Sequence, residues 1–129
     1  MSTSHPDLLQ EVQAIAQLES TAAAQNAIQA SLEVLRNRIV GDEASQLADQ
    51  LPEEMGQYLR GAEATRGESF GINEFYQRVA ERGSIDIMQT PMQVKAVFLA
   101  ISHKVSSGEI EDVKQNLPAD YRELFLAIA

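Results

Sequence analysis

Two histidines, His5 and His103, are the side chains best suited to exchange a proton near neutral pH. A second histidine or a carboxylate four residues away on the same helix would predict a metal site. His103 has neither at that spacing, and it lies off the apolar stripe of its predicted helix. His5 lies close to the N-terminus. We interpret both as solvated side chains, and we assign no catalytic, cofactor-binding or metal-ligating residue.

Carboxylates are abundant, but they gather where helices are expected to begin. Glu53 and Glu54 follow one proline, and Glu109, Glu111 and Asp112 follow a Ser-Ser-Gly turn. Acidic side chains in a first turn complement the helix dipole, so we interpret these clusters as structural. A calcium loop would need oxygen ligands at alternating positions around a central glycine, and this stretch lacks that spacing. A magnesium or calcium site assembled across several helices stays open as an alternative.

Other catalytic patterns are missing from the sequence. The chain has no cysteine, which excludes disulfides, thiol catalysis and thiolate metal sites. It has neither the glycine spacing of a phosphate-binding loop nor a G-x-S-x-G nucleophile elbow. We therefore expect a protein without a cofactor that is not an enzyme.

Charge narrows the choice of partners. The 129 residues carry 10 basic and 19 acidic side chains, a formal net charge of −9. Such a surface repels nucleic acids and anionic membranes. The first ten residues lack a basic, apolar leader, and no apolar run reaches the ~20 residues that span a bilayer. We expect a cytoplasmic protein with no nucleic-acid or membrane partner, although acidity could also mimic DNA or dock a basic protein.

One sequence pattern occurs twice in the chain. LADQLPEEMGQYL begins at Leu47 and VKQNLPADYRELF at Val113, so Leu51-Pro52 and Leu117-Pro118 are 66 residues apart. Proline lacks an N–H and fits the first turn of a helix, while the residue before it is pushed out of the helical region. Each Leu-Pro pair therefore predicts a tight corner between two helices, with the leucine facing inward.

The same offset aligns longer apolar stripes. Residues at i, i+4, i+7 and i+11 recur in both copies, which is typical of one helix face. The paired positions are Ile28 with Val94, Leu32 with Phe98, Leu35 with Ile101, and Ile39 with Val105. Gly41 is expected to end the long helix of copy one, with Gly108 in nearly the same place. Ser106 and Glu109 have capping-box spacing.

These patterns predict one all-α domain, residues 1–129, made of two tandem repeats of four helical segments. The first repeat spans about 7–60, the linker 61–71, and the second repeat about 72–128. The helical segments are expected at 7–18, 22–39, 43–50 and 52–60, then at 73–82, 90–105, 109–116 and 118–128. Each repeat alone is small, so we expect both to share a core with approximate internal two-fold symmetry.

Phe70 is the one aromatic residue in the glycine-rich linker. An aromatic side chain in a flexible loop can anchor a partner. It can also fold back onto the core, where burial gains about 2 kcal/mol. We favour the second interpretation and keep Phe70 as a possible partner anchor.

The second copy resembles a known bacterial family. The helix start FYQRVAERG, the later Gly108-Glu109 and the pair Leu117-Pro118 are similar to the family called domain of unknown function 2267. The resemblance covers most of residues 7–128 and implies an all-helical chain that carries the unit in tandem. The first copy lacks the Glu-Arg pair. The resemblance implies no activity, substrate or cofactor.

The functional hypothesis follows mainly from the absence of catalytic and cofactor-binding patterns in the sequence. We expect a non-enzymatic protein-interaction or adaptor module, monomeric or weakly dimeric, whose protein partner is unknown. The alternative is an enzyme or small-ligand binder with its site between the two repeats, where a pocket with converging polar groups would be needed.

Overall fold

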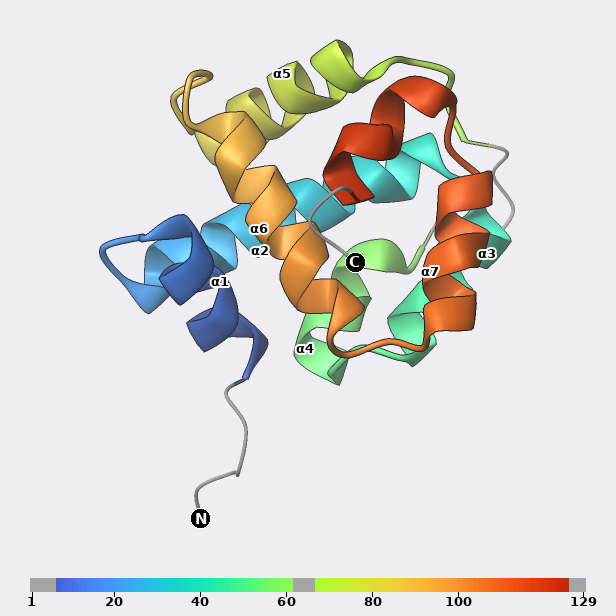
Figure 1. Ribbon diagram of the computed structural model, residues 1–129, viewed down its shortest axis with the longest axis horizontal. Coiled ribbons are helices and arrows are strands. Elements are labelled where there is room, and N and C mark those ends of the chain that lie inside the picture. Colours follow the sequence, from blue (N-terminus) through green and yellow to red (C-terminus); the bar gives the residue numbers. More distant parts are fainter. Residues whose placement is uncertain (1–6, 62–66, 126–129) are drawn as a thin grey trace.

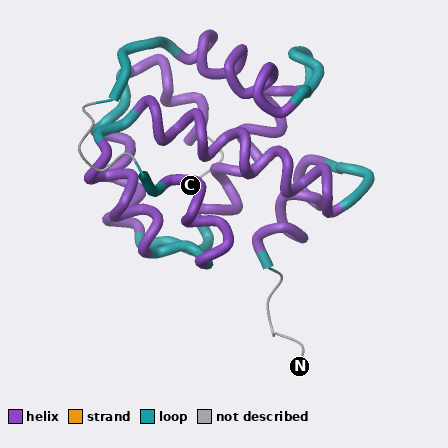
Figure 2. Tube along the Cα trace, turned by 180° about the vertical axis from the view of Figure 1, so that it is seen from behind, coloured by secondary structure: helices purple, strands orange, loops and turns teal. Residues whose placement is uncertain are grey.

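The chain folds entirely into helices in a computed structural model that describes residues 7–61 and 67–125. Those residues contain no β-strand, which confirms the all-α class (Figures 1 and 2). None of these helices combines the length and apolar character that crossing a bilayer requires.

Each half of the chain contains a series of helices. The first half contains α1 (Leu8–Ala16), α2 (Thr21–Arg38), α3 (Gly41–Asp49), α4 (Glu53–Gly56) and the 3-10 turn η1 (Gln57–Leu59). The second half contains α5 (Ile72–Gly83), α6 (Thr90–Ser102), α7 (Ser107–Gln115) and the 3-10 helix η2 (Ala119–Phe125). The last element of the second half is thus a 3-10 helix, and α6 ends three residues before its predicted end at 105.

Local sequence explains most helix starts. The side chain of Asp7 accepts from the N–H of Gln10 at 2.9 Å, and it caps α1. Ser20 caps α2 through the N–H of Ala23 at 3.1 Å. Ser106 caps α7 in the same way. These bonds satisfy backbone donors that a helix start leaves without an intrahelical partner.

The expectation that Gly41 ends a helix is wrong. α2 ends at Arg38, the C-cap Ile39 that follows it is extended, and Gly41 is the buried first residue of α3. Gly108 also lies in the first turn of a helix, α7. Residues with left-handed φ follow α1 and α5 instead, at Gln17 (55°) and Ser84 (52°). The turn after α2 is held by the burial of Ile39, 1% exposed, and needs no glycine flexibility.

The core is built around α2 and α6, which pack against each other at the centre of the molecule (Figure 1). The predicted stripe residues on these two helices and just beyond them are at most 9% exposed: Ile28, Leu32, Leu35, Ile39, Val94, Phe98, Ile101 and Val105. They belong to one hydrophobic cluster. The long stripes therefore close on each other, as their period predicts.

Helices of the first half also pack against helices of the second half. α1 packs on α6 as well as on its neighbour α2, and α5 packs on α2 as well as on α6. α3 packs on α7 (Figure 1). Side chains 66 residues apart in the sequence are consequently brought together along the α3–α7 contact.

Candidate functional site

The two Leu-Pro pairs lie between helices. Leu51 and Leu117 are 7% and 9% exposed, and both belong to the core cluster. Pro52 is the residue that caps α4, and Pro118 immediately precedes η2. The proline carbonyls accept the N–H of Gly56 at 2.8 Å and of Tyr121 at 3.0 Å. These pairs shape the backbone, and they present no reactive group.

Phe70 is buried, with 7% of its surface exposed. The guanidinium of Arg78 stacks over its ring, 3.9 Å from the ring centre. Its carbonyl accepts hydrogen bonds from Arg38 Nε at 2.8 Å and from the Tyr121 hydroxyl at 2.7 Å. Burial raises the pKa of Tyr121 to about 12, while nearby Arg38 opposes the rise. In this conformation the ring pins the linker to the core and offers a partner almost no surface.

His103 gains a partner that its neighbours in the sequence do not reveal. Its Nδ1 lies 2.6 Å from Oε2 of Glu11 on α1, and Lys104 Nζ lies 3.7 Å from the other oxygen of that carboxylate. The histidine side chain is 52% exposed. This surface contact ties α1 to the end of α6, and a contact of that kind contributes little stability. His5 lies outside the described residues.

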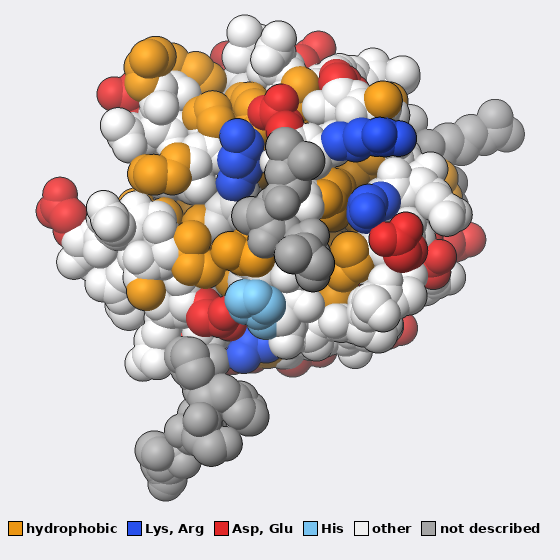
Figure 3. All heavy atoms as spheres, viewed as in Figure 1, with side chains coloured by type: hydrophobic (Ala, Val, Ile, Leu, Met, Phe, Trp, Pro, Cys, Tyr) orange, Lys and Arg blue, Asp and Glu red, His pale blue; other side chains and the backbone are white. Residues whose placement is uncertain are grey.

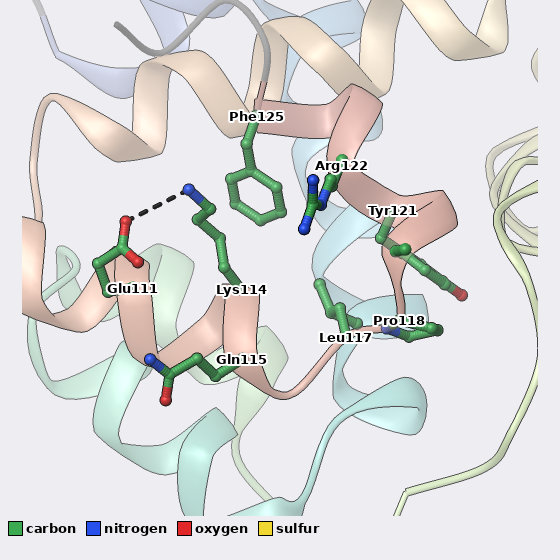
Figure 4. A pocket seen from close by; sticks show the side chains of 9 residues that line it. Glu111, Lys114, Gln115, Leu117, Pro118, Tyr121, Arg122 and Phe125 are labelled. Atoms are coloured by element: carbon green, nitrogen blue, oxygen red, sulfur yellow. Dashed lines mark hydrogen bonds and ion pairs between the residues drawn. The ribbon is translucent and has the colours of Figure 1, made fainter.

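A hollow of about 490 Å³ lies between α7 and η2 (Figure 4). Lys114, Arg122 and the ring of Phe125 converge on it, whereas Tyr121 points its hydroxyl away. Lys114 Nζ is 3.3 Å from Glu111 Oε2 and 5.9 Å from the centre of the Phe125 ring. Residues 126–129, which follow Phe125 directly, are outside the described part of the chain. All residues that line the hollow belong to the second half of the chain.

An apolar groove of about 490 Å³ lies where α1 meets α6. It is lined by Ile15, Met88, Pro91, Met92, Lys95, Ala96 and Leu99. Met88 is 81% exposed, Met92 45% and Ile15 39%, and the neighbouring Ile87 is 47% exposed. Figure 3 shows hydrophobic side chains gathered over α1, the start of α6 and the loop before it. Large apolar side chains that are contiguous and exposed mark interaction surfaces in soluble proteins.

Three carboxylates meet at the contact between α3 and α7. Oxygen atoms of Glu43, Glu109 and Asp112 all lie within 4.8 Å of one another. Glu43 is the third residue of α3, and Glu109 is the third residue of α7. Glu109 is 5% exposed, Glu43 is half-buried and Asp112 is exposed. Burial raises the pKa of Glu109 to about 8, and the carboxylates of Glu43 and Asp112 add to the rise.

Comparison with known proteins places the chain in a family. A family model described as "Uncharacterized conserved protein (DUF2267)" matches residues 5–124. The chain belongs to DUF2267. This confirms the resemblance seen in FYQRVAERG and Leu117-Pro118. No curated protein matches the sequence.

Sequence reasoning did not locate either feature of this DUF2267 chain. It assigned Glu109 and Asp112 to a helix dipole and left a cation site across helices open without naming Glu43, although the 66-residue offset pairs Glu43 with Glu109. It also read only the core stripe of 90–105. A second apolar stripe, Met88, Met92 and Leu99, runs at the same helical spacing on the outward side. Testing each helix for two stripes would have found it.

Proposed function

We propose that this protein is a protein-interaction module, and that the groove between α1 and α6 binds an amphipathic helix of a partner protein. The observation that carries this proposal is the exposure of Met88 and Met92 beside Ile15 on the wall of that groove. An amphipathic helix presents apolar side chains at i, i+3 or i+4 and i+7, which suits a groove between two helices.

The composition of α6 supports the proposal that a partner covers the groove. Its sequence, TPMQVKAVFLAIS, has one charged residue, Lys95, and apolar residues on both its inward and its outward side. A helix that is apolar all round is normally buried on all sides. Burying one methionine side chain gains roughly 1.5–3 kcal/mol. Methionine also adapts its shape to different partners, as it does on promiscuous binding surfaces.

The partner helix should carry basic residues beside its apolar face. The chain has a net charge of −9, so a basic segment is attracted to it and an acidic one is repelled. Attraction of this kind speeds association and weakens as salt rises. Salt sensitivity therefore separates this occupant from a second copy of the chain, which would carry the same negative charge.

The proposed module is an internal duplication, with repeats at about 7–60 and 72–128 packed about an approximate two-fold axis. The pairing of helices supports this symmetry, because α1 on α6 is matched by α5 on α2, and α3 meets its counterpart α7. The left-handed residues Gln17 and Ser84 fall at matching positions after the first helix of each repeat. Apolar positions paired by the offset are buried in both halves.

A capture experiment with matched variants tests the proposal. The full chain is immobilised, with Met88→Gln/Met92→Gln as the groove variant. Val40→Gln is the control, because Val40 is a 41% exposed apolar residue between α2 and α3, outside the groove. We expect a lysate protein that binds wild type and the control, is lost from the groove variant, and weakens as salt increases. Equal capture by all three proteins would refute the groove as the docking site.

Self-association is the competing outcome. Sedimentation velocity of the purified protein over a range of concentrations measures it directly. A dimer that disappears in Met88→Gln/Met92→Gln but persists in Val40→Gln would assign the groove to a second copy and overturn the proposal. We expect the wild type to remain monomeric at micromolar concentration.

The alternative of a ligand site between the repeats gains no support from the α2–α6 seam. Side chains such as Ile28, Leu35, Val94 and Ile101 fill that seam, and each is at most 2% exposed. A binding pocket needs a hollow with converging polar groups. The hollow in Figure 4 that has such groups lies within the second half.

A further inference from the structure

The carboxylates between α3 and α7 are placed there by two different helices. Glu43 comes from the first turn of α3 and Glu109 from the first turn of α7, with Asp112 one turn further along α7. Their oxygens lie within 4.8 Å of one another, although Glu43 and Glu109 are 66 residues apart. The cluster is therefore a product of the packing of α3 on α7 and does not arise within one helix.

A role in helix capping does not account for Glu109. The N–H of Glu109 does bond to the Ser106 hydroxyl at 3.1 Å, which is one half of a capping box. The other half would be a bond from the N–H of Ser106 to the Glu109 carboxylate. That N–H instead donates to Gln50 Oε1 at 2.7 Å.

Two oxygens of the cluster lose their hydrogen bond when the acids ionise. Oε2 of Glu109 and Oε2 of Glu43 are buried, and when both carboxyls are ionised neither has a hydrogen-bond donor among the described residues. When Glu109 is protonated, it shares a hydrogen bond with Glu43. Glu109 is 5% exposed, so its carboxylate turns into the α3–α7 contact and away from water. The basic residue of α7, Lys114, pairs with Glu111. Once both carboxyls are ionised, buried carboxylate oxygens without a donor are costly, and a cation between them would remove that cost.

We propose that Glu43, Glu109 and Asp112 bind one divalent cation, with Ca²⁺ preferred over Mg²⁺. All donors are carboxylate oxygens, which are the ligands of hard cations. The three carboxylates each offer an oxygen within 4.8 Å of the other two, close enough to surround one cation. Ca²⁺ accepts a flexible coordination geometry, whereas Mg²⁺ demands a near-ideal octahedron and gives up its waters reluctantly, so side chains held by two separate helices suit Ca²⁺ better. The exposed side at Asp112 leaves room for water to complete the coordination shell.

This site goes beyond the proposed docking function, because it lies on α3 and α7, away from the residues that line the α1–α6 groove. A cation there bridges one helix of each half. The cation stabilises the folded chain, because the three carboxylates are assembled there. The unfolded chain offers no such binding site.

The test uses the purified full chain, stripped with a chelator and then titrated with CaCl₂ in a calorimeter. We expect one Ca²⁺ per chain with a Kd between about 10 µM and 1 mM, the range of Ca²⁺ sites weaker than the tight cytosolic buffers. Glu109→Gln and Asp112→Asn should each weaken binding at least about tenfold. Glu111→Gln, an exposed carboxylate on the same helix, is the matched control and should bind as wild type does.

Thermal unfolding gives a second measurement. Ca²⁺ should raise Tm in wild type and in Glu111→Gln, and much less in Asp112→Asn, a substitution at an exposed position that leaves the core intact. If NaCl at the same ionic strength raises Tm by the same amount, the effect of Ca²⁺ is screening of the net negative charge, and the proposal is overturned. Absence of Ca²⁺ binding at millimolar concentration, or unchanged binding in both ligand variants, would also overturn it. Mg²⁺ binding as tightly as Ca²⁺ would refute the preference for Ca²⁺.

Discussion

Replacing Glu109 by glutamine should make the metal-free protein more stable at alkaline pH. The pKa of Glu109 is raised from 4.5 to about 8 in the folded chain, chiefly by burial. Between these two values the folded chain binds more protons than the unfolded chain, so stability is lost as pH rises through the window. Below about 4.5 both states are protonated, and above about 8 both are ionised, so the loss levels off. Glutamine is always neutral and removes this dependence.

The size of the effect follows from the width of the window. Each pH unit in which the folded chain holds one extra proton changes the free energy of unfolding by about 1.4 kcal/mol. The window from 4.5 to about 8 therefore sets an upper bound of about 5 kcal/mol. Glu43 is only half-buried and can turn toward water when both groups ionise. We accordingly expect about 2–3 kcal/mol.

Urea unfolding followed by circular dichroism, at several values between about pH 5 and pH 8.5 in excess chelator, measures this difference. Wild type and Glu109→Gln should have similar unfolding free energies at the acidic end, and the variant should be the more stable at the alkaline end. Glu111→Gln, which replaces an exposed carboxylate of the same helix, should follow wild type. The reasoning is refuted if wild type and Glu109→Gln keep a constant difference across the whole range.

Three further substitutions test contacts elsewhere, each by the same urea assay at neutral pH. Tyr121→Phe removes the hydroxyl that donates to the Phe70 carbonyl at 2.7 Å, and it should cost about 1–1.5 kcal/mol; no loss would mean that water replaces this bond. Gly56→Ala would place a Cβ 2.8 Å from the carbonyl oxygen of Ala48, and it should cost about 1–3 kcal/mol. Gly108→Ala meets no atom within 4 Å and should stabilise by about 0.5 kcal/mol; an equal loss at both glycines would contradict the difference in packing.

The helix faces could be predicted because their information is local. Four apolar residues at i, i+4, i+7 and i+11 specify one face whatever the rest of the chain does, and Ile28 to Ile39 are buried as that spacing requires. Capping residues are local too, so Ser106 was found from its spacing to Glu109. Gly41 was misread because a glycine signals either a turn or close packing, and the sequence does not distinguish the two. The burial of Gly41 in the first turn of α3 indicates close packing as the reason for the glycine.

The candidate sites could not be predicted in the same way, because each depends on how helices dock. Nothing near His103 in the sequence indicates Glu11, which approaches it only because α1 packs on α6. The sequence does show a second apolar stripe at Met88 and Met92, but only the packing of α1 on α6 shows that these side chains stay exposed beside a groove. The sequence left two interpretations of Phe70, a partner anchor or a side chain buried on the core. The choice between them rests on the two arginines that flank its ring.

The proposed duplication would give the carboxylate cluster a physical origin. About a two-fold axis, a residue near the axis meets its own counterpart, so an apolar residue there meets an apolar residue and an acid meets an acid. Glu43 and Glu109 occupy matching positions, and their oxygens lie within 4.8 Å. A tandem repeat that carries an acid at this position would thus place two like charges together, which favours a shared proton or a bound cation. The alternatives make opposite demands on solution conditions: a shared proton stabilises the chain in acid, whereas Ca²⁺ stabilises it where the carboxylates are ionised. Measuring unfolding against pH with and without Ca²⁺ therefore separates them in one experiment.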